Sequence, residues 1–420
     1  MRIRPWFTGL LGVCLLASCN PSPSRDPVSS VNVGILHSRS GTMALSENTV
    51  AEAERLAIEE INADGGLKLK GQRVLVKSIE EDGRSDPATF ARLAEKLLDR
   101  QNVVAVFGGW TSSSRKAMIP IFEERGGLLF YPVQYEGQEC SAVVVYGGSV
   151  PNQQSTPAVA WMLANKSKRL LLLGSDYIYP KTANRIIRSQ VIKAGGTVLD
   201  ELYLSLGSKA VDPLIKAIVR AKATDPVVVI NTLNGDSNIA FFSALNQAGL
   251  VDDPNLSVLS LSVSEEEAIA IGADNMKGSY ASWSYFQSLN TEASQEFGAR
   301  FRQRYGFHRV INDPAEAGYS LVHLWAKAAE AANSTDPEKV RQALIGMRFD
   351  APQGSLVIMP SQHLRKLSLL GRADAKGRFI VQEDFGVIDP IPWNPVLKES
   401  AGRPCDHSKT TITLQEGLRP

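Results

Sequence analysis

The sequence predicts an α/β fold made of two lobes, each built on a doubly wound parallel sheet. Short continuous apolar runs alternate with amphipathic helical stretches along most of the chain, which is typical of parallel sheets covered by helices on both faces. The alternation occurs twice, once before and once after Pro151. Polar and aromatic residues follow several predicted strands, the place where ligands bind in folds of this class.

In the first half of the chain, apolar runs predict strands and the stretches between them predict helices. Asp86 and Pro87 mark one helix start, because Asp is a favoured N-cap and Pro is favoured at the first helical position. Gly65 and Gly66 end the preceding helix. The predicted strands are 31–36, 74–79, 103–107 and 128–131, and the predicted helices are 48–62, 87–98 and 112–125.

The second half repeats this pattern and then becomes more helical. Gly195 and Gly196 end one helix, and 374–377 predicts a turn between two extended pieces. The predicted strands are 169–174, 197–204, 227–230, 258–261, 365–373 and 378–384. The predicted helices are 152–165, 181–194, 213–223, 237–247, 292–305, 315–332 and 337–345.

Composition excludes several classes of partner. The 420-residue chain has 45 Lys plus Arg and 44 Asp plus Glu, so no net field favours nucleic acid or an anionic membrane surface. A hydrophobic content of 44% and a charged content of 21% are those of a folded globular protein. We therefore expect no nucleic-acid partner.

The N-terminus has the features of an export signal. Arg2 and Arg4 precede an apolar run over 6–17, which is shorter than the about 20 residues of a membrane-spanning helix. The run ends in Leu-Ala-Ser-Cys, which resembles a bacterial lipobox with Cys19 as the lipidated residue. A plain secretory signal with an incidental cysteine is the alternative. The lipobox interpretation assigns 1–19 to a lipoprotein signal and 20–30 to a flexible tether, and places the protein outside the cytoplasm.

Two cysteines remain once the signal is set aside. Cys14 lies inside the signal and Cys19 would carry lipid, which leaves Cys140 and Cys405. In an oxidising compartment these two can form a disulfide. They can equally remain apart, because the sequence does not show whether they lie close enough to bond.

Linear motifs for catalysis, cofactors or metals are missing. The chain has no Gly-Lys dipeptide for a phosphate loop, no dinucleotide fingerprint and no Gly-x-Ser-x-Gly elbow. Its five histidines are far apart and form no metal-binding motif; they are His37, His308, His323, His363 and His407. These observations favour a binding protein without cofactor or metal over an enzyme.

The candidate ligand site consists of four segments that follow predicted strands, two in each lobe. Gly108-Gly109-Trp110-Thr111-Ser112 follows the first, at the start of a helix where backbone N–H groups are free to donate. Ser113 and Ser114 are expected to cap that helix, and the glycines place Trp110 at a loop tip. The other segments are 130–137, 174–180 and 231–237.

The same segments resemble the urea and short-chain-amide binding proteins of bacterial ABC transporters, a branch of the branched-chain amino acid binding family. The most distinctive strings are Tyr-Pro-Val-Gln-Tyr-Glu-Gly at 131–137 and Asn-Thr-Leu-Asn-Gly-Asp-Ser at 231–237. These strings belong to the matching stretches 128–137 and 231–238, and the others are 33–38 with 40–43, 109–116, 151–154, 174–180, 281–286 and 350–352. The resemblance runs from about 31 to about 395, with an additional tail beyond it.

The resemblance implies a type I periplasmic-binding fold, in which three crossovers join two doubly wound lobes that close on a ligand. The crossovers are expected near Pro151, near 262–265 and near 350–353. The expected domains are 31–150 plus 265–350 for lobe 1, 151–264 plus 351–395 for lobe 2, and 396–420 for an irregular tail. A lipid-anchored solute-binding component that serves an ABC permease is the implied function.

The ligand hypothesis that follows is a small neutral amide, with urea first. Amino acid binders of the family hold the zwitterion with Ser and Thr on the loop after the 128–131 strand, and this chain has Tyr-Pro-Val-Gln-Tyr there. In the hypothesis, Ser112 and nearby N–H groups hold the urea oxygen, Asp236 accepts from the NH₂ groups, and aromatic rings cover the plane. The expected ligand-binding residues are Trp110, Thr111, Ser112, Tyr131, Gln134, Tyr177, Tyr179, Asn234 and Asp236.

Two alternatives belong to other functional classes. A sensor that reports a small amide to a signalling partner is suggested by similarity to the amide-sensing regulator of amidase operons, which lacks an export signal. A cleft hydrolase of amides is the other, because catalytic groups need not form a linear motif. Asp236 also has a structural interpretation, as a cap of the helix after Gly235.

Overall fold

The computed structural model describes Met1 and residues 29–409. The predicted signal, Cys19 and most of the tether lie outside the described residues, so the lipid anchor stays a prediction. Within the part of the chain that is described, no helix is both long and apolar enough to cross a membrane.

The first lobe is built on a six-stranded sheet in the order β2-β3-β1-β4-β5-β6. Its strands are β1 (Ser29–His37), β2 (Leu67–Leu69), β3 (Gln72–Asp82), β4 (Val106–Gly108), β5 (Leu129–Tyr131) and β6 (Val144–Tyr146). All neighbours pair in parallel except the edge strand β2, which is antiparallel to β3. The sheet is therefore doubly wound around β1, which lies between β3 and β4.

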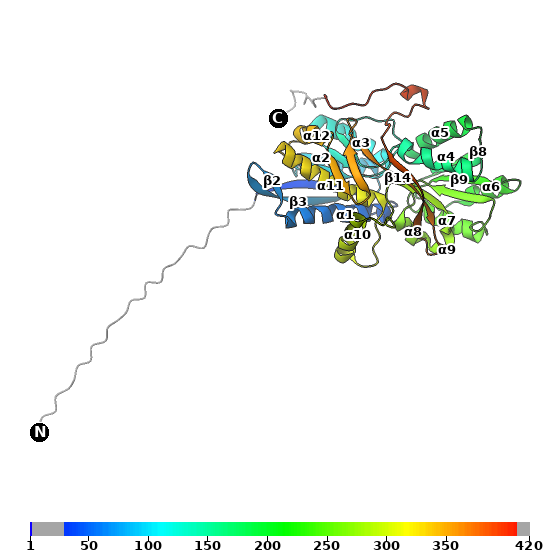
Figure 1. Ribbon diagram of the computed structural model, residues 1–420, viewed down its shortest axis with the longest axis horizontal. Helices are drawn as coiled ribbons and strands as arrows, with labels where there is room; N and C mark the ends of the chain where they lie inside the picture. Colours follow the sequence, from blue (N-terminus) through cyan, green and yellow to red (C-terminus); the bar gives the residue numbers. More distant parts are fainter. Residues whose placement is uncertain (2–28, 410–420) are drawn as a thin grey trace.

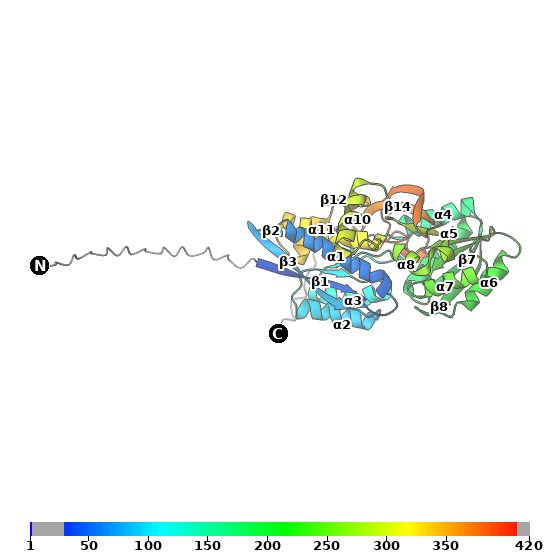
Figure 2. The same cartoon turned by 90° about the horizontal axis from the view of Figure 1, so that it is seen from below.

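Helices cover both faces of this sheet. One pair packs together on one face and a second pair on the other (Figure 2). The first pair is α1 (Ala44–Ala63) with α11 (Asp313–Ala332), and the second is α2 (Pro87–Asp99) with α3 (Ser112–Arg125). The predicted start of α2 is confirmed, because the Asp86 side chain accepts a hydrogen bond from the Thr89 backbone N–H at 2.8 Å. The lobe also contains α10 (Glu292–Tyr305), α12 (Pro337–Leu344), β12 (Arg348–Ala351) and β13 (Gly354–Ile358).

The second lobe is doubly wound around β7, which lies between β8 and β9. Its strands are β7 (Arg169–Ser175), β8 (Thr197–Leu204), β9 (Val227–Thr232), β10 (Leu256–Ser260), β11 (Tyr280–Trp283), β14 (Leu364–Ala373) and β15 (Phe379–Ile388). Strands β7 to β11 pair in parallel, and β14 and β15 add antiparallel pairs. Its helices are α4 (Ser155–Asn165), α5 (Ile178–Lys193), α6 (Asp212–Lys222), α7 (Ser237–Gln247), α8 (Glu265–Ile271) and α9 (Ala273–Met276).

Alternate residues of β7 enter two different cores. Leu171 and Leu173 pack with residues of α6, α7 and α8, whereas Leu170 and Leu172 pack with residues of α4 and α5. Because successive side chains of a strand point to opposite faces, a strand covered on both faces must be apolar throughout. The continuous apolar run at 169–174 predicted this arrangement, and the two-lobed α/β fold is confirmed (Figure 1).

Two of the expected lobe boundaries differ in the structure. The 3₁₀ turn Pro151–Gln153 lies between β6 and α4, at the position where the first crossover is predicted. Residues 265–283 belong to the second lobe, because α8 and α9 pack in its core and β11 pairs with β10. Residues 351–358 belong to the first lobe, since Leu356 and Ile358 are buried in its core. The second crossover therefore follows Trp283 instead of lying at 262–265, and the third lies at the start of β14 instead of at 350–353.

The segment after β15 returns across the molecule. It runs along the upper edge of Figure 1, in red, from the second lobe toward α12 of the first. Apart from one short 3₁₀ turn at Lys398–Ser400 it is irregular as far as residue 409, the last one described. Cys140 and Cys405 form a disulfide, so of the two possibilities left open by the sequence the structure shows the bonded one.

Candidate functional site

The carboxyl ends of the central strands of both sheets face each other across the junction between the lobes. Gln134, which follows β5, donates from Nε2 to the Leu261 carbonyl oxygen at 3.0 Å and to Ser262 Oγ at 3.2 Å, both beyond β10. The Asp236 backbone N–H, beyond β9, donates to Thr42 Oγ1 at 3.1 Å. Ligands of doubly wound folds bind at this edge of the sheet, where strand order reverses.

Gly235 allows the β9 loop to approach the first lobe closely. Its φ is +63°, a conformation that residues with a Cβ rarely adopt. A Cβ atom at this position would also lie 2.5 Å from Thr42 Oγ1 and 2.8 Å from the Thr42 carbonyl oxygen. The glycine in the Asn-Thr-Leu-Asn-Gly-Asp-Ser string therefore has a structural reason, which is close contact between the lobes.

Gln134 occupies the centre of this junction. Its carboxamide oxygen Oε1 is buried and has no hydrogen-bond partner among the described residues. Gln154, at the first crossover, donates to the same Leu261 carbonyl at 3.1 Å, and the Tyr179 hydroxyl lies 3.5 Å from it. Burial raises the pKa of Tyr179 to about 12, against the opposing effect of hydrogen bonds with Ser262 and Gln134. Among these side chains, the Gln134 Oε1 oxygen is therefore a strong acceptor without a partner, and Gln134 is one of the ligand-binding residues predicted from the sequence.

Aromatic side chains from both lobes surround this region. Trp110 is 3% exposed and belongs to the core of the first lobe, so the expectation that its side chain lies at a loop tip is wrong. Tyr131 is buried and donates its hydroxyl hydrogen to the Trp110 carbonyl oxygen. Tyr177, from the second lobe, lies with its ring centroid 6.2 Å from that of Tyr179. Burial, with Tyr179 and Tyr131 adding to it, raises the pKa of Tyr177.

A buried cluster of charges lies next to these rings. The Arg115 side chain is fully buried; its Nε donates to Glu139 Oε1 at 2.7 Å, and its Nη2 lies 3.7 Å from Glu136 Oε1. Its guanidinium carbon is 4.7 Å from the centroid of Tyr131 and 4.4 Å from that of Tyr135. Burial opposes ionisation of Glu139, but the charge and hydrogen bond of Arg115 outweigh it and lower the pKa of Glu139 to about 2. The positive charge of Arg115 is thus compensated inside the protein.

Two predicted ligand residues have hydroxyl groups that are already engaged. Ser112 Oγ donates to Glu136 Oε2 at 2.5 Å and accepts from Arg115 Nη1 at 3.3 Å. Its proton is therefore committed to a carboxylate, which argues against the role of donor to a urea oxygen. Thr111 is the N-cap of α3, since its Oγ1 accepts from the Ser114 N–H at 3.0 Å, so the cap is not one of the serines named from the sequence.

The loop after β9 contains polar side-chain groups that are not engaged in the same way. Asn234 Nδ2 donates to the Thr232 carbonyl oxygen at 3.1 Å, and the Asn234 backbone N–H donates to Ser175 Oγ at 2.9 Å. Asp236 is half-buried and makes no side-chain cap for α7, so the capping interpretation is wrong. The next residue, Ser237, is buried and its Oγ has no partner among the described residues. Ser237 was overlooked as a candidate, although it ends the distinctive string at 231–237.

A second contact between the lobes joins α8 to α1. Ser46 Oγ donates to Glu267 Oε1 at 2.5 Å, and Thr49 Oγ1 donates to Glu266 Oε1. Arg309 Nη1 lies 3.6 Å from Glu266 Oε1. The contact adds a run of three buried glutamates to the junction, which the sequence analysis did not single out.

The stability of the protein should fall as the pH rises toward the pKa of Glu265, the first of these three glutamates. Burial raises the pKa of Glu265 to about 8, with Asp313 and Glu267 adding to the effect and the Gln287 N–H opposing it. Between about 4.5, the ordinary value, and about 8 the folded state holds a proton that the unfolded state has lost, which lowers the unfolding free energy by up to about 1.4 kcal/mol per pH unit. Glu265→Gln mimics the protonated acid, so its melting temperature should match that of the wild type near pH 5 and exceed it at pH 8. Equal melting temperatures at pH 8 would contradict this assignment.

Comparisons with known proteins agree with this architecture. The family model described as periplasmic binding protein domain matches residues 31–399. The Leu/Ile/Val-binding protein homolog 6 of Brucella melitensis is 22% identical over 342 residues, which covers 80% of this chain and 85% of that protein.

Solved structures resemble the whole two-lobed body. A solute binding protein of an ABC transporter from Rhodopseudomonas palustris BisB5, in complex with 3,4-dihydroxybenzoic acid, superposes with a TM-score of 0.73 at 18% identity, covering 86% of this chain and 98% of that one. The branched-chain amino acid transporter substrate binding protein LivJ of Streptococcus pneumoniae, in complex with isoleucine, gives 0.72 at 18% identity, with 86% and 100% covered. At this level of identity the likeness concerns the fold.

Proposed function

The chain belongs to the periplasmic binding protein family, and on that basis we propose that it is the solute-binding component of an ABC transporter whose ligand is a small neutral amide, with urea first. It is a binding protein, with no reaction of its own. The ligand would lie between the lobes, at the carboxyl ends of β4, β5, β7 and β9, and contacts to both lobes would favour the closed state.

The observation that carries the choice of a neutral ligand is the compensated charge of Arg115. The ligands in the two solved structures, a dihydroxybenzoic acid and isoleucine, both have a carboxyl group. In this chain the buried guanidinium is engaged by Glu139 and Glu136, so an anionic group would have to displace one of them. A carboxylate buried without a cation or a full set of donors is strongly disfavoured.

The unused atoms at the junction fit an amide better. Gln134 Oε1 and the Asp236 carboxylate are acceptors for N–H groups, and the Ser237 hydroxyl is a donor for a carbonyl oxygen. Urea offers four N–H hydrogens and one oxygen, and the rings of Trp110 and Tyr177 suit its flat, uncharged faces. This assignment replaces Ser112 by Ser237 as the hydroxyl donor and keeps the other roles of the sequence-based hypothesis.

A thermal-shift panel at pH 7 tests the ligand class, because a ligand that binds only the folded state raises its melting temperature. Urea at low millimolar, formamide and acetamide should raise the melting temperature, whereas leucine and 3,4-dihydroxybenzoate should leave it unchanged. Urea at these concentrations is far below denaturing levels. A shift with leucine or the benzoate and none with any amide would overturn the proposal.

Asp236→Ala should weaken urea binding more than tenfold, since it removes the side-chain acceptor proposed for the NH₂ groups. Asp176→Ala is the matched control in the same lobe, because Asp176 is exposed and pairs with Lys181. Its affinity should stay within about twofold of the wild type. Loss of affinity below tenfold in Asp236→Ala, measured by calorimetry, would remove Asp236 from the site.

We further propose that Cys19 carries a lipid that attaches the exported protein to a membrane. The support is the Leu-Ala-Ser-Cys sequence at the end of the apolar N-terminal run. Mass spectrometry of the protein from its native membrane should give an N-terminal peptide that begins at a lipid-modified Cys19. An N-terminal peptide with an unmodified Cys19 would contradict the anchor.

A further inference from the structure

The segment 389–409 touches the hinge between the lobes directly after β15. Asn152, in the first crossover, binds it on both sides: Nδ2 donates to the Asp389 carbonyl oxygen at 2.8 Å, and Oδ1 accepts from the Ile391 N–H at 2.8 Å. The paired amide contacts fix the start of the segment to the part of the chain that bends when lobes move.

The segment then packs on the loop that carries Gln134. The Gln138 N–H donates to the Pro392 carbonyl oxygen at 2.8 Å, and Ser400 Oγ donates to the Gln138 side chain. Gly137 permits this approach, since its φ is +66° and a Cβ there would lie 2.6 Å from the Pro392 oxygen. The glycine of the Tyr-Pro-Val-Gln-Tyr-Glu-Gly string therefore leaves room for segment 389–409 to pack against this loop.

The same segment also reaches the second lobe and ends on the first. Glu399 forms an ion pair with Arg185 of α5, in the second lobe. Beyond it, the His407 N–H donates to the Pro360 carbonyl oxygen at 2.8 Å, and the His407 carbonyl accepts from Arg341 Nη1 at 3.0 Å. The segment thus contacts hinge, second lobe and first lobe in turn.

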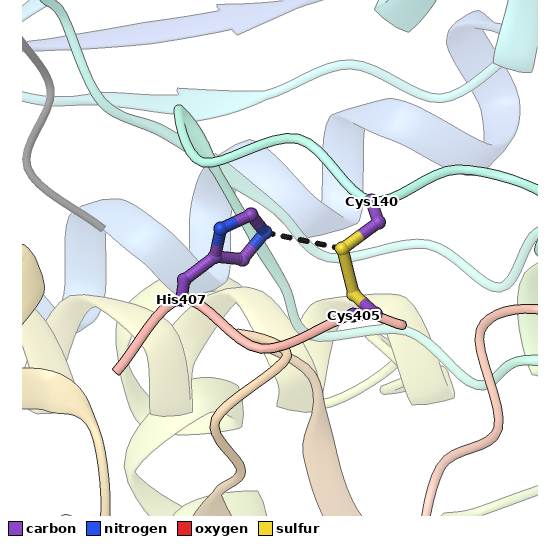
Figure 3. Close-up of side chains that lie close together, drawn as sticks. All are labelled: Cys140, Cys405 and His407. Atoms are coloured by element: carbon purple, nitrogen blue, oxygen red, sulfur yellow. Dashed lines mark hydrogen bonds between the residues drawn. A yellow bond between two sulfur atoms is a disulfide. The ribbon is translucent and has the colours of Figure 1, made fainter. Parts of the chain in front are cut away.

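The disulfide fastens the far end of this segment beside the buried charge cluster. Cys405 is bonded to Cys140, which follows Glu139, the partner of Arg115. Both sulfur-bearing residues are half-buried, so a small thiol has access to them. His407 Nε2 lies 3.1 Å from Cys140 Sγ, where it is able to exchange a proton with a thiol (Figure 3). Burial, with Arg341 adding to it, lowers the pKa of His407 and keeps the ring neutral at pH 7.

We propose that segment 389–409 is a strap across the two lobes, that the Cys140–Cys405 disulfide holds it in place, and that a dithiol reductant releases it and loosens the closed state. In the reaction, a reductant thiolate attacks one sulfur of the pair, the other sulfur leaves and takes up a proton, and the second reductant thiol resolves the mixed disulfide. Two electrons pass to the protein, which gains two thiols, while the reductant becomes a disulfide.

Release would act on the cleft through the loop at 131–139. Without the disulfide, the contacts of Pro392 and Ser400 with Gln138 are held by non-covalent interactions alone. The loop that positions Gln134 and Glu139 then loses its contact with Pro392. The lobes also lose the ion pair between Glu399 and Arg185. Opening of the cleft is favoured in the reduced protein.

The test compares the folded, mature protein before and after treatment with dithiothreitol, by hydrogen exchange and small-angle scattering. Reduction should speed exchange about tenfold or more in 389–409 and in 131–139, leave β9 protected, and increase the radius of gyration. A Cys140→Ser, Cys405→Ser variant should reproduce the reduced state without reductant. Neither readout requires the transported solute, so failure of this proposal is separate from failure of the proposed function.

Glu399→Gln is the control that keeps the disulfide and weakens only the contact with the second lobe. It should increase the radius of gyration less than reduction does and leave exchange of the Cys140 region unchanged. Faster exchange confined to 389–409 on reduction, with an unchanged radius of gyration, would overturn the proposal. It would mean that the disulfide only fixes this segment locally to the surface. No change in exchange on confirmed reduction would overturn it as well.

Discussion

Replacing Arg115 by alanine should lower the free energy of unfolding by about 3–5 kcal/mol, the cost typical of breaking a buried ion pair. Arg115 is fully buried, pairs with Glu139 and Glu136, and lies against the rings of Tyr131 and Tyr135. In the variant, Lys116 still faces Glu139, but among the described residues no other cation pairs with Glu136. Denaturant unfolding followed by circular dichroism measures the loss.

Lys116→Ala is the matched control, because Lys116 binds the same Glu139 at 2.8 Å but is 37% exposed. An ion pair open to solvent contributes little, so the expected loss is below about 1 kcal/mol. A loss in Arg115→Ala no larger than in Lys116→Ala would show that the buried cluster is not a structural element of the first lobe.

Replacing Gln134 by alanine should weaken urea binding by about ten- to a hundredfold, equivalent to about 1–3 kcal/mol for a buried polar partner. The residue contributes twice, since its Oε1 is the unused acceptor proposed for the ligand and its Nε2 bonds to the second lobe. The variant therefore loses a ligand contact and also part of the closed state. Calorimetric titration of both proteins with urea gives the ratio of affinities.

Gln154→Ala separates these two effects. Gln154 donates to the Leu261 carbonyl oxygen at 3.1 Å and to the Ser282 carbonyl oxygen at 2.8 Å, yet it is given no ligand contact. Its loss should cost stability and change urea affinity by no more than about threefold. Equal loss of affinity in both variants would mean that Gln134 acts through its bond to the Leu261 carbonyl oxygen and not on the ligand.

Much of the fold could be predicted from the sequence because local signals agreed with each other. Continuous apolar runs such as 169–174 identified strands covered on both faces, and Asp86 with Pro87 marked a helix start that the structure confirms. The lobe boundary at 265 was wrong because β11 is only four residues long, Tyr280–Trp283, and carries no periodic pattern. Pairing with β10 and β14, which no local pattern reveals, decides where those residues belong.

The sequence indicated which segments follow strands, but not how their side chains are engaged. The four segments follow strands whose carboxyl ends meet at the junction, and a ligand-binding role for Trp110, Tyr131, Gln134 and Asp236 stays a prediction. The engagement of Ser112 depends on Glu136, 24 residues further along the chain, and on a buried arginine in the next helical turn. Hydrogen-bond commitments of this kind come from tertiary packing, which sequence reasoning did not reach.

A calorimetric titration of the mature protein with urea at pH 7 decides whether the cleft between the lobes binds a small neutral amide. Four non-hydrogen atoms at about −1.5 kcal/mol each limit the binding free energy to about −6 kcal/mol, so a saturable isotherm with a Kd on the order of tens of micromolar or weaker is expected. Leucine titrated under the same conditions should give only heat of dilution. A saturable isotherm for leucine, with only heat of dilution for urea, would contradict the neutral-amide site and assign the cleft to an amino acid.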